Sequence, residues 1–202
     1  QPNKIVFAKE GFYVQNFGIR NSNEYITVNS TAPHYNTPIK ANISNFLLSN
    51  ITEVISKDTL LANGILVGTV DVKQLNSTPQ VAAALKITNL SVLGDTIGNL
   101  SIDVSNATDK AVDATVAING HGNDIKLTGM YYPTPVEGNN FNMDLLLAPL
   151  NVKTIEGATA NQIRNTTGLL NGKLHIQGTM TNPIIEGELK TDNLSTNIAM
   201  LN

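Results

Sequence analysis

The sequence predicts an all-β protein made of antiparallel strands. Only 14% of the 202 residues are charged and 5% are aromatic, whereas average globular chains contain roughly 25% charged residues. Thr, Val and Ile, which fit a pleated surface, and Asn and Gly, which favour turns, are abundant. Many short segments alternate apolar and polar residues, and one long segment occurs as two similar copies. These three observations predict the fold class.

The repeated segment reads "GILVGTVDVKQLNSTPQVAAALKITNL" at 64–90 and "GLLNGKLHIQGTMTNPIIEGELKTDNL" at 168–194. The two copies align without a gap at an offset of 104 positions, which also brings Pro79 onto Pro183. Because this period is far longer than the roughly 20 to 50 residues of a solenoid coil, each copy must contain several strands.

The same offset continues upstream, and with a small adjustment residues 23–28 also align with residues 123–127. We therefore predict two repeat units of about 104 residues, at 1–94 and 95–202, with the second continuous with the first. The sequence begins without an initiator Met or a signal peptide, and we expect it to be a piece of a longer protein.

Period-two alternation of apolar and polar residues places strands along both units. Glycine and asparagine at 92–100 and 118–124 supply tight turns, so neighbouring strands should be antiparallel. Short helical connectors are expected near 46–56 and 152–163, at equivalent places in the two units. The predicted strands lie near residues 26–28, 39–43, 65–73, 81–88, 100–104, 114–118, 125–127, 143–147, 170–176 and 185–190.

The apolar positions of these strands should share one face of the sheet, and that face must be covered by something. They are small and aliphatic rather than aromatic, which suits a flexible acyl chain better than a rigid ligand. Slim strands in a tightly curved sheet would have the same composition. The candidate lipid-binding residues are Ile26, Val28, Ile39, Ile43, Leu66, Val70, Val72, Val81, Leu85, Ile87, Ile102, Val104, Val116, Ile118, Ile125, Leu127, Met143, Leu145, Leu147, Leu174, Ile176, Ile185 and Leu189.

Two glycines, Gly68 and Gly172, occupy equivalent positions on the same predicted face. We expect them to mark a bend or bulge that curves the sheet, or to leave room for a lipid tail. The two interpretations are compatible.

Composition and motifs predict a protein that is not an enzyme. The net charge of −3 gives no electrostatic reason to expect nucleic acid as a partner, and the chain contains no cysteine. The acidic residues are scattered, and nucleotide-binding and serine-hydrolase motifs are absent from the sequence. His175 takes the place of Asp71 in the other copy, which indicates a solvated position. We predict no catalytic residue, no cofactor and no metal site.

The glycine and proline pattern "G.L.G.L.I.G....P...G.L....L" of residues 168–194, together with "VLGDTIGNLSIDV" at 92–104, resembles the C-terminal part of TamB proteins. These translocation and assembly module proteins belong to the AsmA-like group, and the resemblance is greatest to versions from Bacteroidota. It covers most of the chain and is strongest from residue 64 to residue 202.

This resemblance implies a curved, β-taco-like antiparallel sheet that forms an open hydrophobic groove. It implies a periplasmic location that bridges the inner and outer membranes of a Gram-negative bacterium, and a role in outer-membrane assembly and integrity. The groove would shield phospholipid as a transported ligand. An outer-membrane barrel of the TamA or TamL type would be the protein partner, through a C-terminal part that this sequence does not contain.

The Bacteroidota resemblance also implies O-glycosylation at Asp-Ser/Thr-aliphatic triplets, which makes Thr59 and Thr96 candidate acceptors. Two other functions stay open. The first is a structural or adhesive β-repeat protein with a dry core. The second is a carbohydrate-processing or carbohydrate-binding β-repeat protein, which would need exposed aromatic residues such as Tyr131 or Tyr132 beside several acids.

Overall fold

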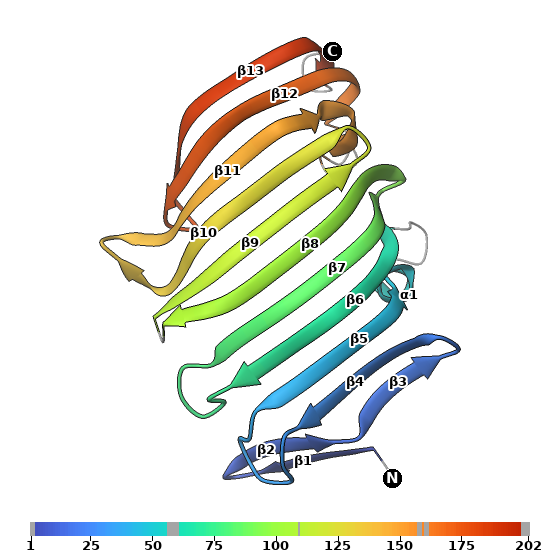
Figure 1. Ribbon diagram of the computed structural model, residues 1–202, viewed down its shortest axis with the longest axis vertical. Helices are drawn as coiled ribbons and strands as arrows, with labels where there is room; N and C mark the ends of the chain where they lie inside the picture. The colour runs from blue at the N-terminus through green and yellow to red at the C-terminus, as the bar shows by residue number, and fades with distance from the viewer. Residues whose placement is uncertain (1–2, 56–60, 109, 157–158, 160–161, 199–202) are drawn as a thin grey trace.

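The computed structural model describes residues 3–55, 61–108, 110–156, 159 and 162–198. The predicted all-β antiparallel class is confirmed. Eleven strands form one sheet in the order β13-β12-β11-β10-β9-β8-β7-β6-β5-β4-β3, and β1 and β2 form a separate two-stranded sheet (Figure 1). Each strand of the large sheet is antiparallel to its neighbour in the sequence, so the chain meanders from one edge of the sheet to the other.

The strands lengthen along the chain, from five residues at the N-terminal end to sixteen at the C-terminal end. Their bounds are β1 Lys4–Ala8, β2 Gly11–Gln15, β3 Phe17–Asn21, β4 Glu24–Ser30, β5 Ile39–Leu47, β6 Ala62–Lys73, β7 Gln80–Val92, β8 Asp95–Thr108, β9 Ala111–Gly120, β10 Asn123–Val136, β11 Asn139–Asn151, β12 Ile163–Gly178 and β13 Pro183–Ile198.

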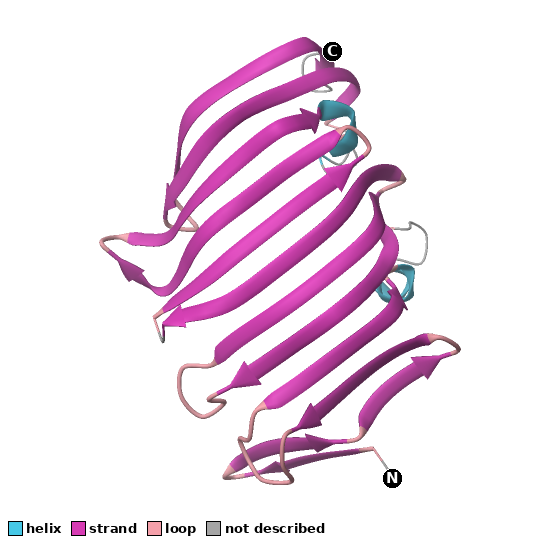
Figure 2. Ribbon diagram, in the orientation of Figure 1, coloured by secondary structure: helices cyan, strands magenta, loops and turns pink. Residues whose placement is uncertain are grey.

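Two short helical connectors follow β5 and β11, where the sequence predicts them. The first is the α-helix α1, Ser49–Ile55, and the second is a single 3-10 turn, η1, Val152–Ile155. The first predicted connector begins later than expected, because Phe46 and Leu47 belong to β5. Figure 2 shows both connectors at the same ends of the strands. None of the helices in the described residues has the length and apolarity to cross a membrane.

Strand pairing follows the sequence repeat. The pairs Ile43 with Gly68 and Phe46 with Leu66 join β5 to β6, and the residues 104 positions later, Leu147 with Gly172 and Leu150 with Leu170, join β11 to β12. Both ladders contain the same irregularity, three steps on one strand against two on the other. The pairs of β6 with β7 have equivalents 104 positions later in β12 with β13. The β5-to-β7 segment and the β11-to-β13 segment therefore share one register.

A bulge lies directly beside each of Gly68 and Gly172, because the ladders of β5 with β6 and of β11 with β12 shift register immediately after the pairs Ile43–Gly68 and Leu147–Gly172. On their other side both glycines pair regularly, with Leu85 and Leu189. A second pair of bulges lies opposite Gly64 and Gly168, where β7 and β13 each insert one extra residue. Asn89 and Asn193 lie within these insertions and have left-handed backbone conformations, with φ of 53° and 48°. An inserted residue increases local bending and twist, so the repeated bend is produced by two strands together.

The buried core is small and lies mainly at the ends of the strands. Near the connectors, Phe46, Leu90, Leu147 and Val152 are buried. Val14 of the N-terminal hairpin is also buried, and its backbone N–H donates to Ser30 Oγ at 3.0 Å. The hairpin therefore packs against β4 at one edge of the sheet, while the middle of the large sheet has no second layer in the described structure.

The aliphatic face as candidate functional site

The candidate site is one face of the eleven-stranded sheet, which we call the aliphatic face. Register partners have their side chains on the same face, and so do residues two apart along a strand. Three rows of partners cross the sheet. They are Ile19-Ile26-Ile43-Gly68-Leu85-Ile102-Val116-Leu127-Leu145-Leu174-Gly187 (the central row), Phe17-Val28-Ala41-Val70-Ala83-Val104-Ala114-Gly129-Met143-Ile176-Ile185, and Phe46-Leu66-Ile87-Leu100-Ile118-Ile125-Leu147-Gly172-Leu189.

All 23 candidate residues lie in these rows or in a short fourth row, Ser30-Ile39-Val72-Val81. Sequence reasoning missed Phe17, Ile19 and Phe46, although alternation with the candidate positions could have found Phe17 and Ile19. The alternation pattern places the alanines of the second row, Ala41, Ala83 and Ala114, on this face, although they are not among the candidate lipid-binding residues. The rows join both halves of the chain into a single surface, which at roughly 4.8 Å per strand is about 48 Å across.

Most side chains of the aliphatic face are half-buried. Leu147, which lies beside the η1 connector, is 6% exposed, whereas Ile185 and Leu189 on β13 are 59% and 50% exposed. In residues 81–88 the face positions are half-buried and most positions between them are exposed. Neighbouring side chains reduce the exposure of this face, but no layer of the described structure covers its middle.

Glycines on the aliphatic face are covered by leucines from the next strand. An added Cβ at Gly68 would lie 2.1 Å from the Ala84 carbonyl oxygen and 2.9 Å from a Leu85 methyl carbon. The equivalent values at Gly172 are 2.1 Å from the Glu188 carbonyl oxygen and 3.0 Å from a Leu189 methyl carbon. The leucine side chains occupy the space that a side chain at either glycine would need. These glycines let neighbouring strands pack closely and keep the surface aliphatic.

Polar side chains fix the connectors at one end of this face. Glu24 Oε2 accepts hydrogen bonds from the Leu47 backbone N–H at 3.3 Å and from the Asn50 side chain at 2.6 Å. In the second half, Asn123 Oδ1 accepts from the Asn151 N–H at 2.8 Å. The Asn123 amide nitrogen also donates to Thr154 Oγ1 at 3.1 Å and to the Ile97 carbonyl at 2.8 Å.

A second pair of contacts joins each connector to the strand that follows it. Thr52 Oγ1 donates to the Ala62 carbonyl at 3.0 Å. Glu156 Oε1 accepts from both the backbone N–H and the hydroxyl of Thr166, each at 2.5 Å. These hydrogen bonds hold the pKa of Glu156 below its ordinary value of 4.5. The two connectors thus occupy the same position with different side chains.

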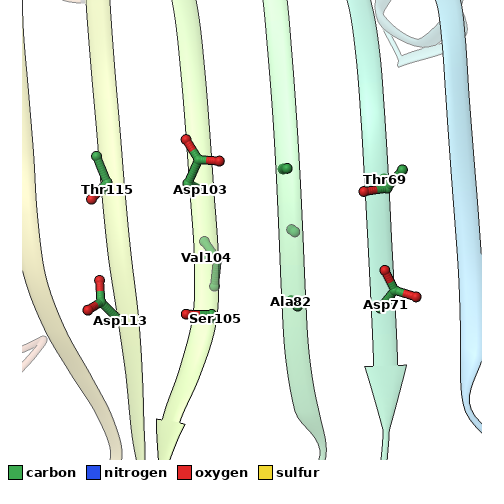
Figure 3. Close-up of a pocket in the computed structure, with 10 residues that line it drawn as sticks. Thr69, Asp71, Ala82, Asp103, Val104, Ser105, Asp113 and Thr115 are labelled. Atoms are coloured by element: carbon green, nitrogen blue, oxygen red, sulfur yellow. The ribbon is translucent and has the colours of Figure 1, made fainter.

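The opposite, polar face carries open hollows instead of an aliphatic surface. One of them has a volume of about 320 Å³. Figure 3 shows Asp71, Asp103 and Asp113 on β6, β8 and β9 at this hollow, with Ala82 between them. Lys40 Nζ lies 3.8 Å from Asp71 Oδ1. On the same face His175 Nδ1 is 2.9 Å from Asp144 Oδ1, with Glu186 as the partner of His175 on β13.

The described residues contain no group of three or more His, Asp or Glu side chains that could hold a metal ion. Of the two candidate glycosylation sites, Thr96 is exposed at the start of β8, and Thr59 lies outside the described residues. Tyr131 is exposed, but its register partners are Val112 and Phe141. No protein-family model, curated protein or solved structure matches the chain.

Proposed function

We propose that this chain is a non-catalytic segment of a cell-envelope protein that shields phospholipid acyl chains during transport between the inner and outer membranes. The observation that carries the proposal is the aliphatic face, which runs without a charged residue through the central row from Ile19 to Gly187 and has no covering layer over its middle.

The energetics of lipid transport favour such a surface. Transfer of a CH₂ group into water costs about 0.8 kcal/mol, so two 16-carbon tails oppose desorption by on the order of 20 kcal/mol. A surface that accepts acyl chains anywhere along its length lowers this cost without holding the lipid in one place. Half-exposed aliphatic side chains and glycines covered by leucines form a surface of this kind.

We propose that the chain is built from two units of about 104 residues, which together form an open groove. The equal register of the β5-to-β7 and β11-to-β13 segments supports the two-unit construction. The groove would lie in the periplasm and lead to an outer-membrane barrel of the TamA or TamL type, with a role in outer-membrane assembly. This setting rests on the resemblance to TamB proteins.

Thr96 is our proposed O-glycan acceptor within the described residues, and Thr59 is the second proposed acceptor. The exposure of Thr96 on the strand end beside Asp95 supports this assignment. Intact-mass measurement of the protein purified from its native host tests it. A mass equal to that of the unmodified chain would contradict it.

Photo-crosslinking to lipid tests the proposed function. A benzophenone amino acid is placed at Val116, in the central row, or at the adjacent Ala117, whose register partners Ser101 and Lys126 lie on the polar face. The protein is irradiated with vesicles of phosphatidylethanolamine and phosphatidylglycerol and analysed by mass spectrometry. We expect phospholipid adducts at Val116 and not at Ala117.

Equal adducts at the two positions, or none at Val116, would overturn the proposal. The second outcome is also what a structural β-repeat protein with a dry core would give. Because the two positions are neighbours on one strand, they differ mainly in the face on which the crosslinker lies.

A further inference from the structure

We infer that the free edge of β13 is a binding site for an antiparallel β-strand, and that the register and chemistry of this strand can be read from β8. In the described part of the chain, β13 pairs only with β12, and the side chains of residues 183–197 are exposed. A long edge strand with free backbone donors and acceptors is a template for pairing with another strand. The inference does not depend on the proposed lipid function.

β13 pairs with its preceding strand in the same register as β7 does, and in β7 the other edge is paired with β8. β7 pairs with β6 through Val72 with Val81 and Gly68 with Leu85. β13 pairs with β12 through the residues 104 positions later, Ile176 with Ile185 and Gly172 with Leu189. Both strands also bend at an asparagine with left-handed φ, Asn89 and Asn193. The edge of β7 that faces away from β6 pairs with β8. The corresponding edge of β13, which faces away from β12, has no such strand in the described structure.

The pairing of β7 with β8 predicts the register of the strand that binds β13. β8 places Val104 opposite Ala83, Ile102 opposite Leu85 and Gly98 opposite Leu90. The equivalent residues of β13 are Gly187, Leu189 and Leu194. We therefore expect an incoming strand with aliphatic residues opposite Gly187 and Leu189 and a glycine opposite Leu194, where the bend brings backbones close together. Such a strand would add one residue each to the central row, beside Gly187, and to the row that ends at Leu189.

Two asparagine side chains of β8 add a second recognition feature. Asn99 Oδ1 accepts a hydrogen bond from the Asn89 backbone N–H at 3.1 Å, and Asn106 Oδ1 accepts one from the Val81 N–H. The equivalent backbone groups of β13 belong to Asn193 and Ile185. An incoming strand with asparagine or aspartate at these two positions would satisfy both N–H groups.

Charge distinguishes the expected strand from β8 itself. β8 has Asp103 opposite Ala84 on the polar face. The β13 residue at the place of Ala84 is Glu188, so a strand identical to β8 would set two carboxylates opposite each other. Like charges in directly opposite positions destabilise a strand pair. We infer that the partner strand carries Lys or Arg at this position, and that β8 of a second copy is disfavoured.

Peptide binding tests this charge rule. One peptide copies residues 95–106, and the other carries Asp103→Lys. Since an opposite-charge cross-strand pair replaces a like-charge pair, we expect the lysine peptide to bind the protein about three- to tenfold more tightly. The Glu188→Lys protein should show the reverse preference. Because Glu188 pairs with Lys173 on β12, the variant also carries Lys173→Glu, which keeps an opposite-charge pair within the sheet. Both side chains are exposed, so this protein should fold like the parent.

Disulfide trapping tests the register, because the chain has no native cysteine. A peptide carrying Ile102→Cys should form a disulfide with Leu189→Cys protein and much less with Lys190→Cys protein, whose side chain lies on the polar face. No peptide binding, an unchanged preference in Glu188→Lys protein, or equal trapping at the two positions would overturn the inference. Disulfide dimers of the Leu189→Cys protein in place of the peptide adduct would also overturn it, because the edge would then take a second copy.

Discussion

At the scale of single residues, the bend of the sheet depends on Gly168 and on its counterpart Gly64. Gly168 has φ of 107°, and an added Cβ would lie 2.6 Å from the carbonyl oxygens of Asp192 and Asn193. These carbonyls belong to β13, at the place where the inserted residue brings the two strands together. The glycine is therefore required by the neighbouring strand as well as by its own backbone conformation.

Substitution of Gly168 by Ala should be more destabilising than substitution of Gly138 by Ala. Gly138 also has positive φ, 81°, but an added Cβ there would meet no atom within 4 Å. We expect the Gly138 variant to lose about 1 kcal/mol from its backbone conformation, and the Gly168 variant to lose a further 1 to 3 kcal/mol, roughly, from the clash with β13. Urea unfolding of both variants measures the difference. Equal losses would show that the close approach of β13 does not matter.

At the scale of elements, the two connectors are anchored to the sheet at equivalent places by different side chains. Glu24 and Asn123 both accept the backbone N–H at the end of the strand that precedes the connector. Asn123 is buried and joins three segments, because it also contacts Thr154 and the Ile97 carbonyl. A buried side chain with all these partners fixes where the strand ends. The connectors therefore position the ends of the aliphatic face.

The second connector should give the protein an acid-sensitive contribution to stability. The pKa of Glu156 is lower in the folded state because Thr166 donates two hydrogen bonds to the carboxylate. Its stabilising contribution is therefore complete above the unfolded pKa, near 4.5, and is lost as the pH falls through the lower folded pKa. We expect Thr166→Val to raise the pKa of Glu156 and to weaken this acid dependence.

Urea midpoints measured from about pH 7 down to about pH 3 test this expectation. Glu156→Gln is the matched control, since it keeps an acceptor at the same place but cannot titrate in this range. The difference between parent and control should shrink on acidification below pH 4.5 or so. A constant difference across the range would contradict a role for the Glu156 carboxylate.

The sequence predicts the elements well because strand alternation is local and the aliphatic positions recur every second residue. The offset between Gly64 and Gly168 also anticipates the shared register. The bulges opposite Gly64 and Gly168 could not be located, because an inserted residue is defined only by the strand that pairs with it. The contacts of Glu24 and Asn123 were missed for a similar reason. They join residues 23 to 31 positions apart in the sequence, and the two accepting side chains differ.

At the scale of the whole molecule, the described fold is an open eleven-stranded sheet with a small two-stranded sheet at one edge and a small core. Its stability comes from strand pairing along the sheet, from the connectors, and from contacts between neighbouring side chains on the aliphatic face. A sheet of this kind can lengthen by adding strands at an edge without any change in its cross-section. The proposed pairing at β13 and the proposed surface for acyl chains would therefore both follow from one architecture.

Dye binding should separate this architecture from one with a dry core. We expect the native chain to bind the apolar-surface dye ANS, because the middle of the aliphatic face has no covering layer. A triple variant of the central row, Leu85→Ser, Val116→Ser and Leu127→Ser, should lose most of this fluorescence while its far-UV circular dichroism still shows a β-sheet. The control variant changes the adjacent polar-face residues, Lys86→Ser, Ala117→Ser and Lys126→Ser, and should bind the dye like the parent. If the aliphatic residues formed a dry core, the native chain would not bind the dye and the central-row variant would unfold.

Substitution of a half-buried side chain costs far less folding free energy than substitution of a fully buried one, since the stabilisation follows the apolar area removed from water. We therefore expect the sheet to survive substitution at these three positions, so that dye fluorescence compared with circular dichroism reveals whether the aliphatic face is an accessible surface.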